Sequence, residues 1–157
     1  VISQWPSSLS STTSQNFSFH CWLGLSHQMN SYPYEGRRQI YSLYSNTMGL
    51  ESFIRNSSLF VSITDYRELV YVEISECDDL IDGYWHSLTI VHTAQRPSIF
   101  VAAFQTVSTC QLAIYIDGLI KRQIKDFKYV PLMNDPINLA SIGAPSQRTH
   151  STTNNNK

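Results

Sequence analysis

Apolar side chains recur at every second position in several short segments, and this alternation restricts the fold more than any other feature of the chain. In the first segment, residues 17–25, the odd-numbered positions form an apolar face made of Phe17, Phe19, Cys21, Leu23 and Leu25. His20 and Trp22 fall on the opposite face, because successive side chains of a strand point to opposite sides. No helical period of 3.6 residues persists over the ~10–12 residues that a helix requires. The chain is therefore expected to be all-β.

Further segments carry strand-type patterns rich in Ile, Val, Tyr, Phe and Thr. They span residues 39–45, 49–55, 59–64, 69–75, 85–93, 111–117, 119–125 and 137–142. Short connections predict hairpins between 39–45 and 49–55 and between 59–64 and 69–75, and Asp117-Gly118 predicts a tight turn before residue 119. Many short strands without intervening helices are typical of an antiparallel sandwich or barrel.

The length of 157 residues suits one domain. Residues 1–16 are a Ser/Thr-rich stretch and residues 146–157 a polar one, and neither has the apolar side chains to offset the entropy of ordering. We therefore expect a flexible lead-in over 1–16, a β-sandwich over 17–145 and a disordered tail over 146–157.

The charge of the chain is low and balanced, with 11 Lys+Arg, 12 Asp+Glu and a net charge of −1. Nucleic-acid binding is not expected, because no strong basic field exists to hold a phosphate backbone. Cys21, Cys77 and Cys110 lack zinc-site spacing and fit a reducing compartment. One disulfide plus a spare thiol stays open as an alternative, and no cofactor is expected.

Catalytic motifs are missing from the sequence. It contains no GxSxG, P-loop or GxGxxG motif, and no carboxylate pair has the spacing that a sandwich-type glycoside hydrolase needs. The chain is therefore not expected to be an enzyme. Asp78, Asp79 and Asp82 form an acidic turn, with a calcium site as the alternative interpretation.

Two other groups of residues are candidates for binding. Tyr32, Tyr34, Arg37 and Arg38 lie in one loop, where aromatic rings could stack on a ligand and guanidinium groups could pair with carboxylates or phosphates. Lys121, Arg122, Lys125 and Lys128 follow the Asp117-Gly118 turn. They are expected to protect a sheet edge, with a phospholipid or acidic-partner patch as the alternative.

Three stretches, taken in order, resemble concanavalin A-like, laminin-G-like jelly rolls. Residues 17–22 (FSFHCW) resemble the early strand of these domains, residues 83–88 (GYWHSL) the strand that carries WHxL, and residues 112–118 (LAIYIDG) a later hairpin. Residues 142–145 (IGAP) resemble the strand end that follows. Within this superfamily, the chain looks most similar to the domain found in BEACH–WD40 scaffold proteins, the group of the autophagy-linked FYVE protein, the lysosomal trafficking regulator and neurobeachin.

The resemblance implies a concanavalin A-like antiparallel jelly-roll sandwich in which Trp22 and Trp85 fill the space between the sheets and Asp117-Gly118 forms a turn. It also implies a non-catalytic, cytoplasmic scaffolding module in a membrane-trafficking or autophagy protein. Its partners would be other proteins or neighbouring domains, with peripheral membrane association and glycan binding as open alternatives. The domain looks one closing strand short at its C-terminus. A secreted laminin-G or pentraxin-like lectin that uses calcium at Asp78, Asp79 and Asp82 is the other interpretation.

Overall fold

The computed structural model describes residues 16–26, 36–46, 48–64, 69–94, 109–128 and 137–144. The strands within these residues are β1 (Phe17–Ser26), β2 (Arg38–Tyr44), β3 (Gly49–Arg55), β4 (Ser58–Thr64), β5 (Leu69–Ile74), β6 (Asp82–Ala94), β7 (Thr109–Ile116), β8 (Leu119–Lys128) and β9 (Leu139–Ile142). One short 3₁₀ helix, η1 (Asp78–Ile81), precedes β6. In the described part of the chain, no helix is long and apolar enough to cross a membrane.

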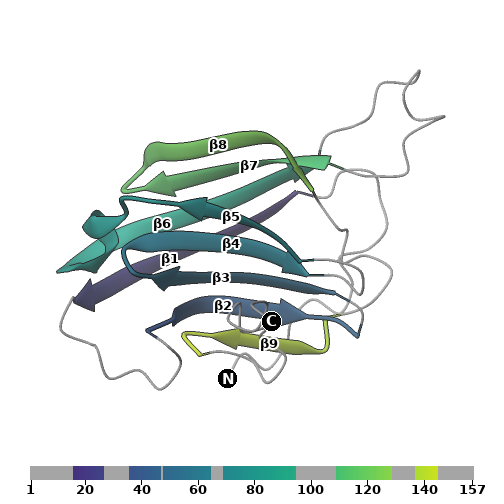
Figure 1. Cartoon of the computed structure of the whole chain (residues 1–157), viewed down its shortest axis with the longest axis horizontal. Helices are drawn as coiled ribbons and strands as arrows, with labels where there is room; N and C mark the ends of the chain where they lie inside the picture. Colours follow the sequence, from purple (N-terminus) through teal and green to yellow (C-terminus); the bar gives the residue numbers. More distant parts are fainter. Residues whose placement is uncertain are drawn as a thin grey trace, which may run out of the picture.

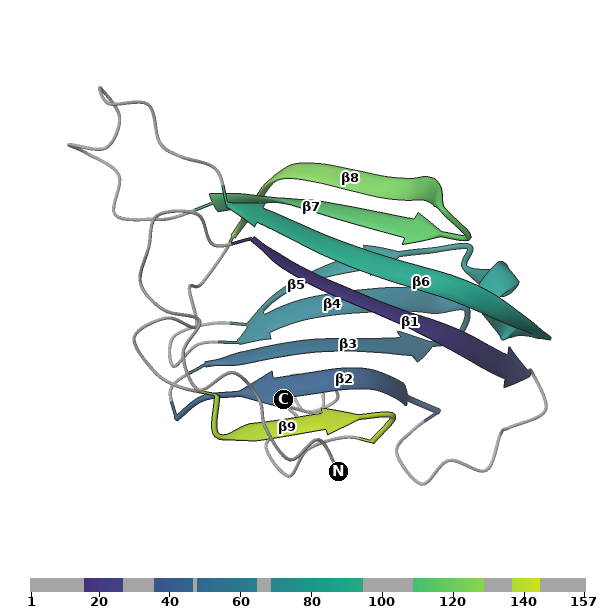
Figure 2. The ribbon, with the colours of Figure 1, turned by 180° about the vertical axis from the view of Figure 1, so that it is seen from behind.

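The strands form two antiparallel sheets. Sheet A has the order β1-β6-β7-β8, and sheet B has the order β5-β4-β3-β2-β9. Figure 1 shows the strands of sheet B running across the molecule, and in the reverse view of Figure 2 β1 and β6 pass in front of them. The two sheets are therefore stacked layers of one β-sandwich, as the sequence predicted.

Each segment with a strand pattern forms a strand, with bounds shifted by a few residues. The pairing of β2 with β3 and of β4 with β5 confirms the two expected hairpins. β7 and β8 also pair, and the turn between them contains Asp117 at φ 51° and Gly118 at φ 77°. Both angles lie in the left-handed region that Gly, Asn and Asp tolerate best, and two such residues in a row suit a two-residue hairpin turn.

The core between the sheets is lined by one face of each strand, and in β2, β3 and β4 the opposite face is buried as well. On sheet A the core-facing positions of β6 and β7 include Leu88, Ile90, Leu112 and Ile114, all with no exposed surface. On sheet B, the matching positions of β4 are Leu59, Val61 and Ile63. Each fully buried aliphatic side chain of this kind contributes about 1.5–3 kcal/mol relative to an exposed one.

Aromatic rings connect the two sheets at the β1 side of the core. Tyr41 on β2 is completely buried, and its ring centroid lies 4.6 Å from that of Phe19 and 6.3 Å from that of Phe17. Phe17 also contacts His92, which contacts Phe127 near the end of β8. These rings fill the space that the resemblance assigned to tryptophan.

The expectation that Trp22 and Trp85 fill the core is wrong. Trp22 is 62% exposed and Trp85 is 71% exposed. Trp22 lies between Cys21 and Leu23, which point toward the core, so its own side chain must point away from it. Trp85 is the register partner of Gly24, which also belongs to the outward-facing positions of β1.

The expected lead-in (1–16, apart from Asn16) and tail (146–157) lie outside the described residues, so the three-part division of the chain stays a prediction. In the part that the structure describes, β1 pairs only with β6 and β9 pairs only with β2. Both strands lie at sheet edges, which agrees with the expectation that a closing strand is missing without testing it.

The packing of the core predicts that two isoleucines of sheet A contribute differently to the free energy of unfolding. Replacing Ile90, which is completely buried, by Ala should lower the free energy of unfolding by about 3 kcal/mol, because the change leaves a cavity. Replacing Ile120, which is 54% exposed on β8, by Ala should cost less than ~1 kcal/mol. Chemical denaturation of both variants measures the difference, and equal losses would contradict the assigned faces.

Candidate functional site

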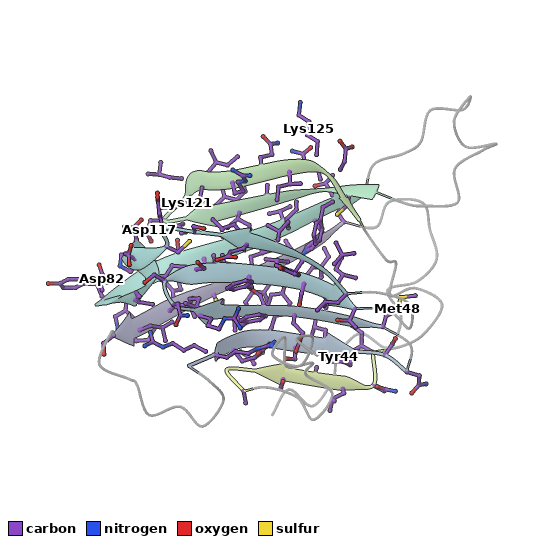
Figure 3. All side chains as sticks on the ribbon, viewed as in Figure 1. Tyr44, Met48, Asp82, Asp117, Lys121 and Lys125 are labelled. Atoms are coloured by element: carbon purple, nitrogen blue, oxygen red, sulfur yellow. The ribbon has the colours of Figure 1, made fainter. Side chains whose placement is uncertain are left out.

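The outward surface of sheet A is the most distinctive surface of the molecule. The strand registers and side-chain alternation place its members in neighbouring rows across the sheet. They are Ser18, His20, Trp22 and Gly24 from β1, Trp85, Ser87, Thr89, Val91 and Thr93 from β6, Gln111, Ala113 and Tyr115 from β7, and Ile120 and Gln123 from β8. We call this surface the indole face. None of these residues is an acid, a lysine or an arginine, and Lys125 follows at the outer margin on β8 (Figure 3).

The two indoles come from adjacent strands. Trp85 is paired in register with Gly24, and Trp22 with Ser87, so the tryptophans are diagonal neighbours. Diagonal neighbours on one face lie about 7–8 Å apart, within reach of aromatic side chains. A ligand that spans this short distance can contact both rings.

Gly24 gives the ring of Trp85 its position. A Cβ atom built on Gly24 would lie 3.2 Å from the indole atoms Cδ2 and Cε2 of Trp85, so the ring lies over the glycine backbone. A side chain at position 24 would push the ring outward by a few tenths of an ångström. The glycine thus keeps one indole flat against the sheet, with its other surface available for contact.

Polar groups lie next to the indoles. Nδ1 of His20 and Oγ1 of Thr89 are hydrogen-bonded across β1 and β6 at 2.8 Å. An arrangement of aromatic rings with hydroxyl and imidazole groups can stack on and hydrogen-bond a neutral ligand.

A second cluster lies where β6 begins, beside the β7–β8 turn. Nδ1 of His86 is 2.7 Å from Oδ2 of Asp117, and Nε2 of His86 is 3.0 Å from Oδ1 of Asp82. Figure 3 shows Asp82 and Asp117 at the same end of the sandwich. The imidazole therefore bridges two carboxylates and links β6 to the hairpin.

The three ionisable groups of this cluster shift one another's pKa values. The hydrogen bond that His86 donates to Asp117, followed by the one that it donates to Asp82, raises the pKa of His86 above its usual range. The backbone N–H of Tyr84 is the main cause that lowers the pKa of Asp82, and His86 is the main cause for Asp117. The raised histidine pKa stabilises the fold below about pH 6.5, and this contribution is lost as the pH rises through the folded-state pKa. The lowered carboxylate pKa values stabilise it above about pH 4 and lose their effect on acidification.

The calcium alternative at Asp78, Asp79 and Asp82 stays a prediction, and the structure shows the partners that two of these carboxylates have. Among the described residues no three His, Cys, Asp or Glu side chains are grouped so that they could hold a metal ion. Asp79 and Asp82 are instead directed to different cations: Asp79 lies 3.3 Å from Nζ of Lys121 on β8, and Asp82 bonds His86. The η1 helix, which the sequence reading missed, separates the carboxylates because it buries Leu80 and Ile81 between them.

The structure describes only part of the candidate binding loop. Tyr32 and Tyr34 lie outside them, so their binding role stays a prediction. Arg37 is described, and its guanidinium lies 3.0 Å from Oε2 of Glu51 and 3.6 Å from the centre of the Phe53 ring. Its side chain is only 9% exposed. Arg37 therefore stabilises sheet B, and its guanidinium is not presented to an external ligand.

Arg38 is only partly accessible as well. It begins β2 opposite Ile54 of β3, and its Nη1 atom is buried without a hydrogen-bond partner in the described part of the chain. The structure thus does not bring Arg37 and Arg38 together into one exposed basic site. The sequence did contain the signal for the indole face, because the alternation in β1 placed His20 and Trp22 opposite the apolar residues.

Comparison with known proteins supports the fold. No protein-family model and no curated protein sequence matches the chain. Among solved structures, domains LG4-5 of the mouse laminin α1 chain match with a TM-score of 0.58 and 9% sequence identity. The match covers 95% of this chain and 33% of that chain, so the chain spans about a third of the laminin structure. The fold is a laminin-G-like jelly roll. At this identity the likeness establishes the architecture alone, and the laminin-G-like sandwich gives the indole face no function by itself.

The His86 cluster predicts that two conservative Asp→Asn substitutions lower the pKa of His86 to different extents. Asp117→Asn should lower the imidazole pKa of His86, since it removes the largest cause of the upward shift while an amide preserves the turn. Asp82→Asn should lower it less. Titration of the imidazole signals by NMR measures both effects, with the unsubstituted chain as reference. A His86 pKa that neither variant changes would contradict the bridge.

Substitution can separate the two interpretations of Arg37, a stabilising role in sheet B and a ligand-binding role. Arg37→Ala should lower the free energy of unfolding by about 3 kcal/mol, because it leaves the carboxylate of Glu51 buried beside an aromatic ring. Arg38→Ala, the matched control, should cost less than ~1 kcal/mol. Thermal or chemical denaturation measures both. Unchanged stability of the Arg37 variant would restore a purely ligand-binding role.

Proposed function

We propose that this chain is a non-catalytic interaction module that binds a protein partner through its indole face. The observation that carries the proposal is the exposure of Trp22 and Trp85 as diagonal neighbours on adjacent strands, with no acid, lysine or arginine among the residues that make up the indole face. Tryptophan is among the residues most enriched at the energetic centres of protein–protein interfaces, where charged residues are depleted. Large exposed aromatic groups on a monomer mark contact surfaces for the same reason.

The surroundings of the indoles also favour a protein partner. The indole face continues from the tryptophans to Thr89 and Tyr115 in the next row and to Val91 in the row after it, and such an extended sheet surface suits contact with another extended surface. His20, Ser87 and Thr89 add polar groups that could bond a partner's backbone. A glycan stacked on one indole, or a lipid surface contacted by both, is a competing occupant that the experiment below separates from a protein.

We further propose that the module belongs to a cytoplasmic scaffold of the BEACH–WD40 type, with neighbouring domains of that scaffold or trafficking proteins as partners. The support is the ordered series of motifs at residues 17–22, 83–88, 112–118 and 142–145. The free cysteines Cys21, Cys77 and Cys110 fit a reducing compartment. A BEACH domain and WD40 repeats encoded downstream in the same gene would support this placement, and a secretory signal with paired cysteines would overturn it.

The binding proposal predicts the effect of removing both indoles. Peptides selected from a displayed library on the unsubstituted chain should bind the Trp22→Ala/Trp85→Ala variant roughly 30-fold more weakly, as expected when about 2 kcal/mol of interface energy is lost. Isothermal calorimetry or fluorescence anisotropy with the purified peptides measures the ratio. The loss should arise without a large change in unfolding free energy, because both rings are mainly exposed.

The matched control is Tyr84→Ala. Tyr84 is 73% exposed and adjacent to Trp85 along β6, but alternation places it outside the indole face. Peptide affinity should be unchanged in this variant. Equal losses in the control and the double variant would contradict the proposed surface. Indole-dependent binding to a glycan array or to phosphatidylcholine vesicles, with no peptide bound, would replace the protein partner by that ligand.

A further inference from the structure

The four strands at the sheet edges differ in how they are protected against pairing with another chain. In the described part of the molecule these edge strands are β1 and β8 in sheet A, and β5 and β9 in sheet B. An exposed edge presents unpaired N–H and C=O groups, and proteins usually protect it with charges, proline, bulges or a short strand. The protection found on each edge therefore indicates which one is free to pair.

Three of the edges carry such protection. β8 presents Lys121, Arg122 and Lys125, which would repel the same cations of a second copy, and its register with β7 is interrupted by irregularities. β9 has only four residues. β5 has six residues and carries the exposed Glu73 next to its last residue.

β1 lacks these devices. It has ten residues, contains no charged residue and no proline, and pairs with β6 without interruption from Phe17 to Gly24. Its irregularity lies only at the far end, between Gly24 and Ser26. A long, regular and uncharged edge is the type that other chains pair with most readily.

The core-facing side chains of β1 are also incompletely covered. Phe17, Phe19, Cys21, Leu23 and Leu25 pack against the core but are only partly buried. Their register partners on the inner strand β6, such as Leu88 and Ile90, have no exposed surface. One further strand beside β1 would cover the apolar surface that these residues leave open.

The sequence of β1 is complementary to itself in the antiparallel direction. With Cys21 opposite Cys21 of a second copy, Phe19 lies opposite Leu23 and Phe17 opposite Leu25, so apolar residues meet apolar residues along the whole core-facing side. On the outward side, His20 would lie opposite Trp22 and Ser18 opposite Gly24. This register brings no like charges together, which is the usual obstacle to pairing identical strands.

We propose that β1 pairs antiparallel with β1 of a second copy of this chain, about a two-fold axis near Cys21. This pair of β1 strands, which we call the joint, makes sheet A continuous across both copies. It covers the partly buried side chains of β1 and extends the indole face over the axis, so that the tryptophans of both copies share one surface. An interface of one strand pair is small, below roughly 1,200 Å², and its dimer forms over micromolar to millimolar concentrations. The proposal does not depend on the partner proposed for the indole face.

The first test is sedimentation velocity of the full 157-residue chain from ~1 μM to ~1 mM. The expected result is a monomer–dimer equilibrium whose dissociation constant rises at least tenfold in the His20→Lys variant. That variant places two cations into the joint, while His20 is exposed and its replacement leaves the core unchanged. Gln123→Lys is the matched control, because it adds the same charge to the same face at the opposite edge strand. Circular dichroism verifies that both variants are folded.

The second measurement is hydrogen–deuterium exchange at low and high protein concentration. Amides of residues 17–26 should exchange more slowly at high concentration, and those of residues 119–128 on β8 should not change. A monomer throughout the concentration range would overturn the proposal. So would a dimer that His20→Lys leaves intact, or a β1 edge that is already protected in the dilute monomer.

Discussion

The contact between Tyr41 and the phenylalanines of β1 holds the two sheets together, and the rest of the structure depends on it. Tyr41 belongs to sheet B and is completely buried, and Phe17 and Phe19 reach it from sheet A. Such ring pairs add about 0.5–1.5 kcal/mol to the stabilisation from burial itself. Trp22 and Trp85 alternate with the core-facing residues of β1 and β6, so their indoles remain outside the layer that these rings and the aliphatic residues fill. The strand register thus determines which side chains the outer surface presents.

The strands could be predicted from the sequence because side-chain alternation is a local signal. The pattern in residues 17–25 identified both faces of β1, and Asp117-Gly118 identified the hairpin between β7 and β8. The error over the tryptophans arose where a role taken from a family resemblance overrode that local signal. The position of β9 beside β2 could not be predicted in this way, since alternation does not say which distant strands pair.

The site was less predictable, because it too depends on contacts between residues that are distant in the sequence. Arg37 looked like a ligand-binding residue because a sequence shows a loop arginine without its surroundings. The pairing of β2 with β3 brings Glu51, fourteen positions away, within 3.0 Å of its guanidinium and places the Phe53 ring beneath it. Likewise, the acidic turn near η1 shows its cationic partners only in the fold, which places Lys121 beside Asp79 and His86 beside Asp82. Charged residues are recognised as structural only when the long-range partner is known.

The two outward sheet surfaces therefore serve different purposes. On sheet B, Arg37 lies over Phe53, Phe53 stacks on Phe60 at 4.8 Å, and Glu51 is 2% exposed, so a ligand there would have to break an ion pair and separate stacked rings. On sheet A no such network occupies the indoles among the described residues, and Gly24 leaves the ring of Trp85 open on one side. Binding at the indole face leaves the packing of the sandwich unchanged, whereas binding at sheet B would disrupt it. The proposed partner is therefore assigned to sheet A, where contact leaves the ion pair and the stacked rings of sheet B intact.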